Sequence, residues 1–259
     1  MAISPDFRTY TGARVAQSGA VLDAGLRSYM LRVYNWMTSG LLLTGAVAYG
    51  VGTNEALKNL FWPVVGMLRG REVHQPSILG YAAIFAPLAF VLVLSFGVNR
   101  LSRSATQALF WAFAATMGVS LSNIFLIYNM GSIAQVFFIT SGTFAAMSLW
   151  GYTTKRDLTA MGSFLMMGLI GIIIASLVNM FIGSTMLQFA ISLIGVLIFV
   201  GLTAYDTQRI KGDYTQYAYA EGSDAAAKRS VFDALTLYLN FINLFTLLLQ
   251  LFGGRSNNN

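Results

Sequence analysis

The sequence contains no cysteine and a single histidine, His74. The lack of cysteine excludes disulfides, thiol nucleophiles, iron–sulfur clusters and structural zinc fingers, and one histidine cannot form a histidine cluster around a metal. Charged residues are also scarce, at 10% of the 259 residues, whereas a soluble domain carries about 25%. Because so few charges cannot cover a water-soluble domain, a soluble protein is excluded.

Apolar residues make up 56% of the chain and give it a mean hydropathy of +0.64. A helix needs about 20 apolar residues to cross a bilayer. We therefore predict an all-α membrane protein with seven transmembrane helices. A further apolar stretch, Leu57–Leu68, is short and interrupted by Pro63, which indicates an interfacial or re-entrant piece. The predicted spans are Val33–Gly52, Ile78–Val98, Ala108–Tyr128, Ile133–Tyr152, Leu158–Ile182, Met186–Tyr205 and Val231–Phe252.

The distribution of Lys and Arg predicts the orientation, because cytoplasmic loops carry an excess of both. With the N-terminus inside, twelve of the 16 basic residues fall on the inner side and four on the outer side. The chain then divides into a cytoplasmic segment, 1–28, a transmembrane domain, 29–253, and a short external tail, 254–259. The first 28 residues show no removable signal peptide. The net charge of +6 fits this orientation, so the expected partner is the lipid bilayer and not nucleic acid.

Two pairs of residues have the spacing of a capping box, in which a hydroxyl and an acid satisfy the free amides at a helix start. They are Thr154 with Asp157 before the fifth span, and Ser230 with Asp233 before the seventh. The polar, alanine-rich stretch Gly212–Ala227 lies between charged edges, so we expect it to be the most mobile loop.

An ionisable residue inside a membrane costs about 2.5–3.5 kcal/mol near a helix centre, and such residues point to function. Asp206, at the end of the sixth span, is the leading candidate. It could form a surface ion pair with Arg209 or Lys211 that contributes little. Alternatively, it could face the bundle interior as a proton-sensitive switch or a cation ligand. Its position in the sequence leaves both interpretations open.

Other polar residues near the spans have structural explanations. Asp233 fits an acid at a helix start, where the dipole favours negative charge, and Arg100 and Arg103 fit positive-inside markers. Asn240 and Asn243 share a helical face with Asp233, and this face should point into the bundle. The sequence lacks the signatures of a zinc protease, a phosphate-binding loop and a serine hydrolase. We expect neither an enzyme nor a cofactor.

The most specific motifs are four blocks, Ser120–Phe125, Trp150–Leu158, Gly201–Gln208 and Leu235–Phe245. In this order they resemble the Bax inhibitor-1 family, also called the transmembrane Bax-inhibitor-motif family. The compact C-terminus is similar to that of bacterial members, which implies the bacterial inner membrane as the location. The resemblance also implies six helices around a central seventh and a pH-sensitive calcium leak.

In that family, aspartates on the sixth and seventh helices share a proton, and an arginine near the second helix engages the first aspartate when the pore opens. Asp206 matches the first aspartate, and Arg100, with Arg103 close behind it, matches the arginine. The second position departs from the pattern, because Asn240 replaces the expected aspartate. Asn240 retains a carbonyl oxygen, so Asp206 and Asn240 are the expected calcium ligands, with reduced negative charge. Asp233 could supply a carboxylate at the cytoplasmic mouth.

These observations predict a calcium or cation leak channel gated by Asp206, with calcium as the permeant ion. A protonated or Asn240-bonded Asp206 would hold the sixth and seventh helices together, and an ionised Asp206 would turn to Arg100. The alternative is a membrane interaction protein that modulates a membrane-bound protease or another partner. In that case Met1–Arg27 and Gly212–Arg229 would carry the function.

Overall fold

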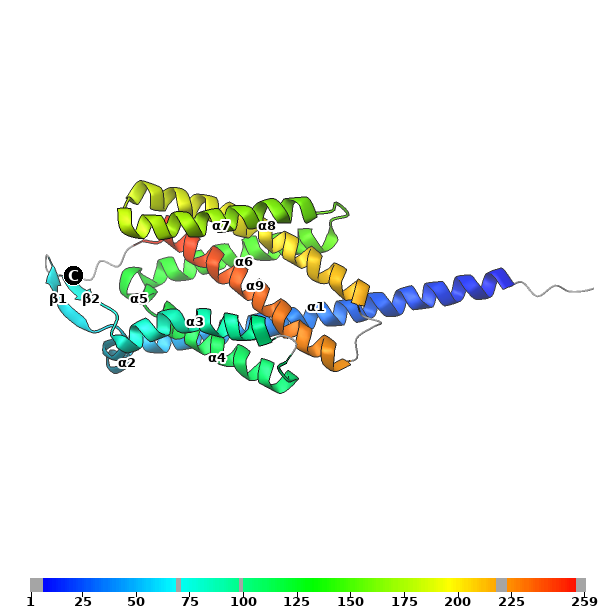
Figure 1. Ribbon diagram of the computed structural model, residues 1–259, viewed down its shortest axis with the longest axis horizontal. Coiled ribbons are helices and arrows are strands. Elements are labelled where there is room, and N and C mark those ends of the chain that lie inside the picture. The colour runs from blue at the N-terminus through cyan, green and yellow to red at the C-terminus, as the bar shows by residue number, and fades with distance from the viewer. Residues whose placement is uncertain (1–6, 69–70, 98–99, 218–222, 255–259) are drawn as a thin grey trace, which may run out of the picture.

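The computed structural model describes the chain except for residues 1–6, 69–70, 98–99, 218–222 and 255–259 (Figure 1). Within the described chain the structure consists of helices and one two-stranded antiparallel hairpin. The elements are α1 (Phe7–Thr53), α2 (Glu55–Phe61), β1 (Val64–Leu68), β2 (Arg71–His74), α3 (Ile78–Gly97), α4 (Arg103–Leu121), α5 (Ile124–Ile127), α6 (Met130–Thr153), α7 (Thr159–Ile182), α8 (Thr185–Tyr217) and α9 (Ser223–Phe252).

Six helical segments of the described chain are long and apolar enough to cross a membrane. They are α3, α4 together with α5, α6, α7, α8 and α9, and they correspond to the second to seventh predicted spans. The first predicted span lies in the C-terminal half of α1 and is not among the six, because Asn35, Thr38, Ser39 and Thr44 dilute its apolar content. The boundary predicted between residues 28 and 29 falls inside α1, which is continuous across it.

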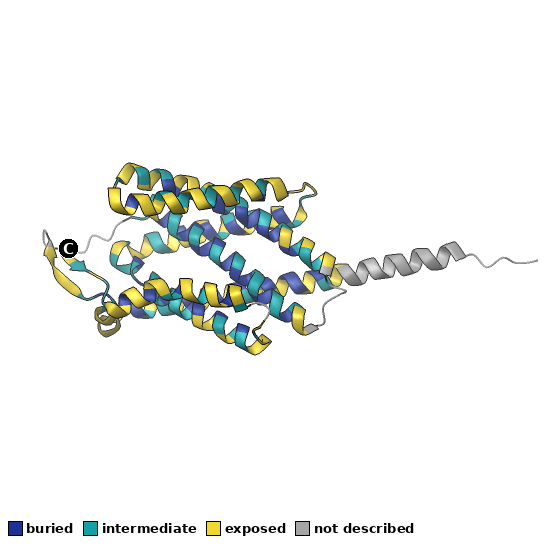
Figure 2. Cartoon of the chain, viewed as in Figure 1, coloured by how far each residue is buried: buried dark blue, intermediate teal, exposed yellow. Residues whose placement is uncertain are grey.

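α9 lies in the middle of the bundle. It packs against α1, α4, α6 and α8. In the most apolar 18-residue stretch of α9, 61% is buried inside the bundle, compared with 6% in the corresponding stretch of the outlying α7. Figure 2 shows buried positions following α9 through the bundle, while α7 is mostly exposed. The remaining helices form two groups, since α1 and α3 pack on α4, and α6 and α7 pack on α8.

A buried hydrogen-bonded chain joins α9 to the group that contains α1 and α4. Thr44 Oγ1 donates to the carbonyl oxygen of Ala114 at 2.8 Å and also hydrogen-bonds with the Tyr238 hydroxyl at 2.6 Å. The Tyr238 ring packs edge-on against Phe113 and Phe110. The hydroxyl therefore has a partner in a region where lipid supplies none.

The stretch Leu57–Leu68, predicted to be interfacial or re-entrant, forms most of α2 and the strand β1, which pairs with β2 beyond it at one end of the bundle (Figure 1). Asn54 caps α2 through its side chain, which accepts from the backbone N–H groups of Ala56 and Leu57. Trp62 anchors the connection, because its buried indole donates to Ser122 Oγ at 2.8 Å. His74 Nδ1 lies 2.8 Å from the Trp62 carbonyl oxygen, which fixes the end of β2 to the same point.

The structure corrects two predictions about the inner loops. α9 begins at Ser223, so Ser230 and Asp233 lie inside the helix and their predicted capping box is wrong. The predicted mobile loop is also wrong over most of its length, because α8 continues to Tyr217 and only residues 218–222 separate it from α9. Hydropathy ended α8 too early and began α9 too late, because the polar ends of both helices extend beyond the apolar spans.

The other predicted box forms only in part. Asp157 accepts from the hydroxyl of Thr159 at 2.6 Å and from its backbone N–H at 2.9 Å, while Thr154 Oγ1 accepts from the Arg156 N–H. The two Thr159 hydrogen bonds, that of the hydroxyl first, lower the pKa of the Asp157 carboxyl below its ordinary value. The acid therefore marks the start of α7 without the reciprocal contact of a capping box.

Gly151 sets the approach of α6 to α8 and generates a test of this packing. A Cβ at Gly151 would collide with the backbone carbonyl of Ala204, whereas one at Gly142 on the same helix would meet no atom within 4 Å. Gly151→Ala should therefore lower stability by about 1–3 kcal/mol, and Gly142→Ala should not. Thermal unfolding of both variants in detergent measures the difference. Equal melting temperatures would contradict the close α6–α8 contact.

Candidate functional site

Asp206 lies buried between α8 and α9, and it is the one charged side chain among the buried residues that the structure describes. Asn240 Nδ2 of α9 donates to Asp206 Oδ2 at 2.7 Å. Arg209, one turn further along α8, places Nη2 3.0 Å from Asp206 Oδ1. The structure combines the two predicted placements, because the residue faces the interior and is also paired with Arg209, while its role as a switch or ligand stays a prediction. A hydrogen bond and an ion pair offset part of the cost of burying the charge.

Asp233 forms a second polar contact on α9, towards the N-terminal end of the helix. The Tyr29 hydroxyl of α1 donates to Asp233 Oδ2 at 2.5 Å. Tyr29 is itself buried, and its ring lies 4.8 Å from that of Tyr214 on α8. Asp233 therefore joins α1 to α9. The adjacent Tyr29–Tyr214 ring contact joins α1 to α8 at the same place.

Neither predicted arginine reaches Asp206 in this structure. Arg100 lies exposed in the turn between α3 and α4, and its backbone N–H donates to Gly97 at 2.9 Å. Arg103 pairs at 3.1 Å with the exposed Asp224 at the start of α9. Arg209 occupies the position beside Asp206 that the resemblance assigns to Arg100.

The surroundings of Asp206 do not fit a resident calcium ion. Calcium takes about six to eight oxygen ligands. Both carboxylate oxygens of Asp206 instead face nitrogen donors, those of Asn240 and Arg209. Across the described residues, no three Asp, Glu or His side chains come together as a metal site. An ion that passes this point would have to displace Arg209, whose side chain is 40% exposed.

Sequence reasoning anticipated some of these contacts and missed others. The three-residue spacing of Asp206 and Arg209 signals their ion pair, and the family pattern placed Asp206 opposite position 240 instead of Asp233. The Tyr29–Asp233 bond joins residues 204 apart. No local spacing could reveal it, and the capping hypothesis gave Asp233 a different role.

The comparisons with known proteins agree with this architecture. The sequence profile of the family described as "Inhibitor of apoptosis-promoting Bax1" matches residues 26–257. The chain belongs to the Bax inhibitor-1 family. Residues 26–257 include α9 and the C-terminal parts of α1, so the family match covers every helix that contributes to the two polar contacts.

Similar members of the family occur in several bacteria. "Inner membrane protein YbhL" of Escherichia coli is 47% identical over 232 residues, 90% of this chain and 94% of the relative. A protein of Rickettsia prowazekii is 47% identical over 234 residues, covering 90% and 92%, and one of Caulobacter vibrioides is 45% identical over 235 residues, covering 90% and 91%. With its apolar helices, the chain is a multi-pass protein of a bacterial inner membrane.

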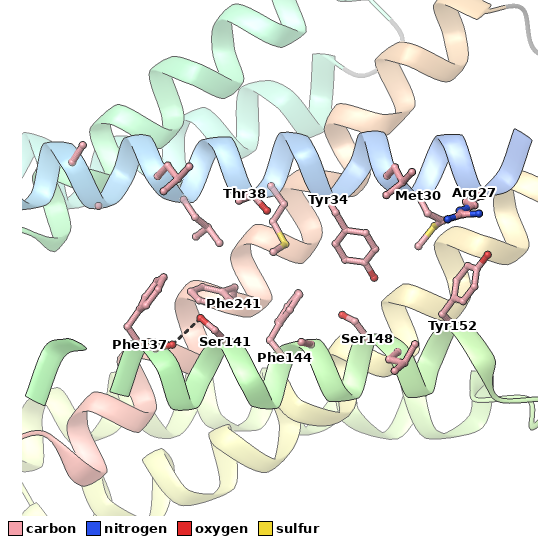
Figure 3. A pocket seen from close by; sticks show the side chains of 18 residues that line it. Arg27, Met30, Tyr34, Thr38, Phe137, Ser141, Phe144, Ser148, Tyr152 and Phe241 are labelled. Carbon is pink, nitrogen blue, oxygen red and sulfur yellow. Dashed lines mark hydrogen bonds between the residues drawn. The ribbon is translucent and has the colours of Figure 1, made fainter. Parts of the chain in front are cut away.

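The Tyr29–Asp233 contact generates a stability test. Tyr29→Phe removes the hydroxyl donor and leaves Asp233 without this bond, which should lower stability by about 1–3 kcal/mol. Tyr34→Phe is the matched control, because Tyr34 lies on the same helix with its ring between α1 and α6 (Figure 3). Thermal unfolding in detergent is the measurement. A Tyr29→Phe protein as stable as the control would show that the bond contributes nothing to the fold.

Proposed function

We propose that this protein is a pH-sensitive calcium leak channel gated at Asp206, with seven spans, a cytoplasmic N-terminus and no enzymatic step. The carrying observation is a charged carboxylate buried between two membrane helices and held by Asn240 and Arg209. A charge at such a position is expensive to keep. The presence of a charge at Asp206 is understandable if the carboxylate exchanges its partners, Asn240 and Arg209, during function.

The seventh span of the proposal is the C-terminal half of α1. This part of α1 packs along α4 and α9, both of which are apolar enough to cross the membrane. Thr44, a polar residue in this stretch, is buried and hydrogen-bonded inside the bundle, which makes the low apolar content compatible with a span. The excess of basic residues on one side then supports a cytoplasmic N-terminus.

In the proposed closed state, the Asp206–Asn240 bond holds α8 against α9. Opening requires Asp206 to leave Asn240, and the resemblance assigns Arg100 as its new partner, with Arg103 nearby. Arg209 can leave more readily than Asn240, because its side chain is partly exposed and can be solvated at the bundle end. Calcium is then a transient substrate at Asp206, not a resident ion.

Calcium flux into proteoliposomes tests the proposal between about pH 6 and pH 8. We expect greater flux at the higher pH, because a protonated Asp206 carries no charge to attract calcium. Asp206→Asn should reduce flux at the higher pH about tenfold or more, since two unit charges about 4 Å apart attract by about 4 kcal/mol at an effective dielectric constant of 20. Glu55→Gln is the control, because Glu55 is an exposed carboxylate on α2 that pairs with Lys58 of its own helix.

Asn240→Asp refines this experiment by restoring the carboxylate that the family pattern expects. A steeper pH response in this variant would support the pairing of positions 206 and 240. If well-folded wild-type protein passes no calcium at any pH and Asn240→Asp does, the chain has lost the channel activity. Equal flux in wild type and Asp206→Asn would exclude Asp206 as the gate.

A second candidate is a membrane interaction protein that modulates a membrane-bound protease or another partner. The observation that favours it is the length of α1, which continues as a helix well beyond the other helices at its N-terminal end (Figure 1). Under this alternative, residues 1–27 and the inner ends of α8 and α9 carry the function.

Deletion of residues 2–22 separates the two candidates. Leu26 and Tyr29 are buried in the core cluster, so the deletion leaves the packed part of α1 intact. A channel should retain its flux in proteoliposomes, within about twofold, because the buried contacts of Asp206 are unchanged. If the deletion variant retains flux but no longer complements a strain that lacks the protein, the result favours the interaction protein. Loss of flux would contradict the proposed independence of the pore from residues 2–22.

A further inference from the structure

α1 and α6 enclose a groove of about 940 Å³ whose floor reaches α9 (Figure 3). Side chains of the two helices face one another across it, and Phe241 of α9 closes it from behind. Since α6 is one of the membrane-spanning helices, the groove lies at the depth of the bilayer. Its contents must therefore be compatible with hydrocarbon.

The walls of the groove suit an acyl chain. Met37, Phe144 and Phe241 line its buried floor, while Leu42 and Leu149 line its exposed rim. The hydroxyl of Ser141, which also lines it, donates to the carbonyl oxygen of Phe137 in its own helix at 2.8 Å (Figure 3). A hydrocarbon chain can thus occupy the groove without leaving this hydroxyl unpaired.

One end of the groove is basic. Arg27 lines this end and is exposed, and it takes part in none of the ion pairs between described residues. Tyr152 of α6 lies at the same end (Figure 3). Lys211 Nζ of α8 lies 5.0 Å from the centre of the Tyr152 ring and donates to the Tyr152 carbonyl oxygen at 2.8 Å. The side chains of Arg27 and Lys211 therefore place two positive charges near the end of an apolar groove.

The groove is longer than an acyl chain needs to be to cross one leaflet. Its α6 wall runs from Phe137 to Tyr152, which corresponds to about 22 Å of helix. One leaflet of hydrocarbon is about 15 Å thick. An acyl chain that begins at the basic end can thus lie in the groove over its full length.

We propose that this groove is a binding site for one anionic phospholipid, with its phosphate at Arg27 and an acyl chain between α1 and α6. The arrangement combines the two interactions that select such a lipid, which are burial of apolar surface and attraction of basic residues to an anionic headgroup. The leaflet is the one at the Arg27 end. The site is separate from Asp206, and lipid binding requires no ion flux.

Native mass spectrometry of the purified protein in detergent tests the site, with phosphatidylglycerol and phosphatidylcholine of identical chains as probes. Wild type should retain one phosphatidylglycerol. Ala145→Trp fills the groove and should abolish retention, whereas Ala146→Trp should not, because Ala146 is exposed on the same helix and does not line the groove. Both variants must elute as single species before they are compared.

A second pair fills the groove from the α1 side. Gly45 lines the groove and Gly50 does not, and a Cβ at either position meets no atom within 4 Å. Gly45→Leu should therefore release the lipid, and Gly50→Leu should keep it. Retention by both groove-filling variants at the wild-type level would overturn the proposal and leave the groove to a helix of another protein.

Arg27→Gln tests the headgroup contact, with Arg156→Gln, in the loop that follows α6, as the control. Arg156 is exposed and lies outside the groove. We expect Arg27→Gln to weaken the preference for phosphatidylglycerol over phosphatidylcholine about fivefold, because one basic residue near an anionic headgroup contributes about 1 kcal/mol. An unchanged preference would show that Arg27 does not bind the phosphate and would overturn that assignment.

Discussion

The polar side chains of α9 can exist inside a membrane only because other helices satisfy them. Lipid offers no hydrogen-bond partner, and α9 carries Tyr238, Asn240 and Asp233 along its length. Each meets a partner from another helix, namely Thr44 and Tyr29 of α1 for Tyr238 and Asp233, and Asp206 of α8 for Asn240. The central position of α9 and the ring of helices around it follow from this requirement.

The candidate site is a product of the same constraint. A helix that must satisfy Asn240 internally needs a polar group opposite it, and α8 provides a carboxylate that is itself buried. Arg209 then balances the charge from a half-exposed position. The residues that secure the fold are therefore those whose rearrangement is proposed to open a path for ions. Under this proposal, stability and gating depend on the same few bonds.

Hydropathy predicted the membrane helices well where the apolar run and the helix coincide, as in α3, which was predicted at Ile78–Val98 and spans Ile78–Gly97. It failed where a helix continues past the apolar run. α8 was predicted to end at Tyr205 but extends to Tyr217, because an amphipathic end can pack on protein instead of lipid. The hairpin β1–β2 was also missed, because its apolar residues resemble an interfacial segment and its pairing is not visible in hydropathy.

The candidate site shows a similar limit. Asp206 was found because a charge beside an apolar run is rare, and Arg209 because it is one turn away. The Tyr29–Asp233 bond depends on the folding of α1 against α9, so a single sequence contains no local signal for it. The basic residues predicted an orientation, but they could not show that Arg27 lines a groove or that Lys211 contacts Tyr152 at the same end of it.

The absence of close α1–α6 packing at the groove has a mechanical consequence. The α1–α3–α4 group is hydrogen-bonded to α9 through Thr44–Tyr238 and Tyr29–Asp233, and the α6–α7–α8 group through Asp206–Asn240. The Tyr238 and Asn240 bonds start from α9 residues that are only two positions apart, so their losses should be coupled and not simply additive. α9 thus connects the two groups at neighbouring positions, so a change in one group is transmitted through α9 to the other.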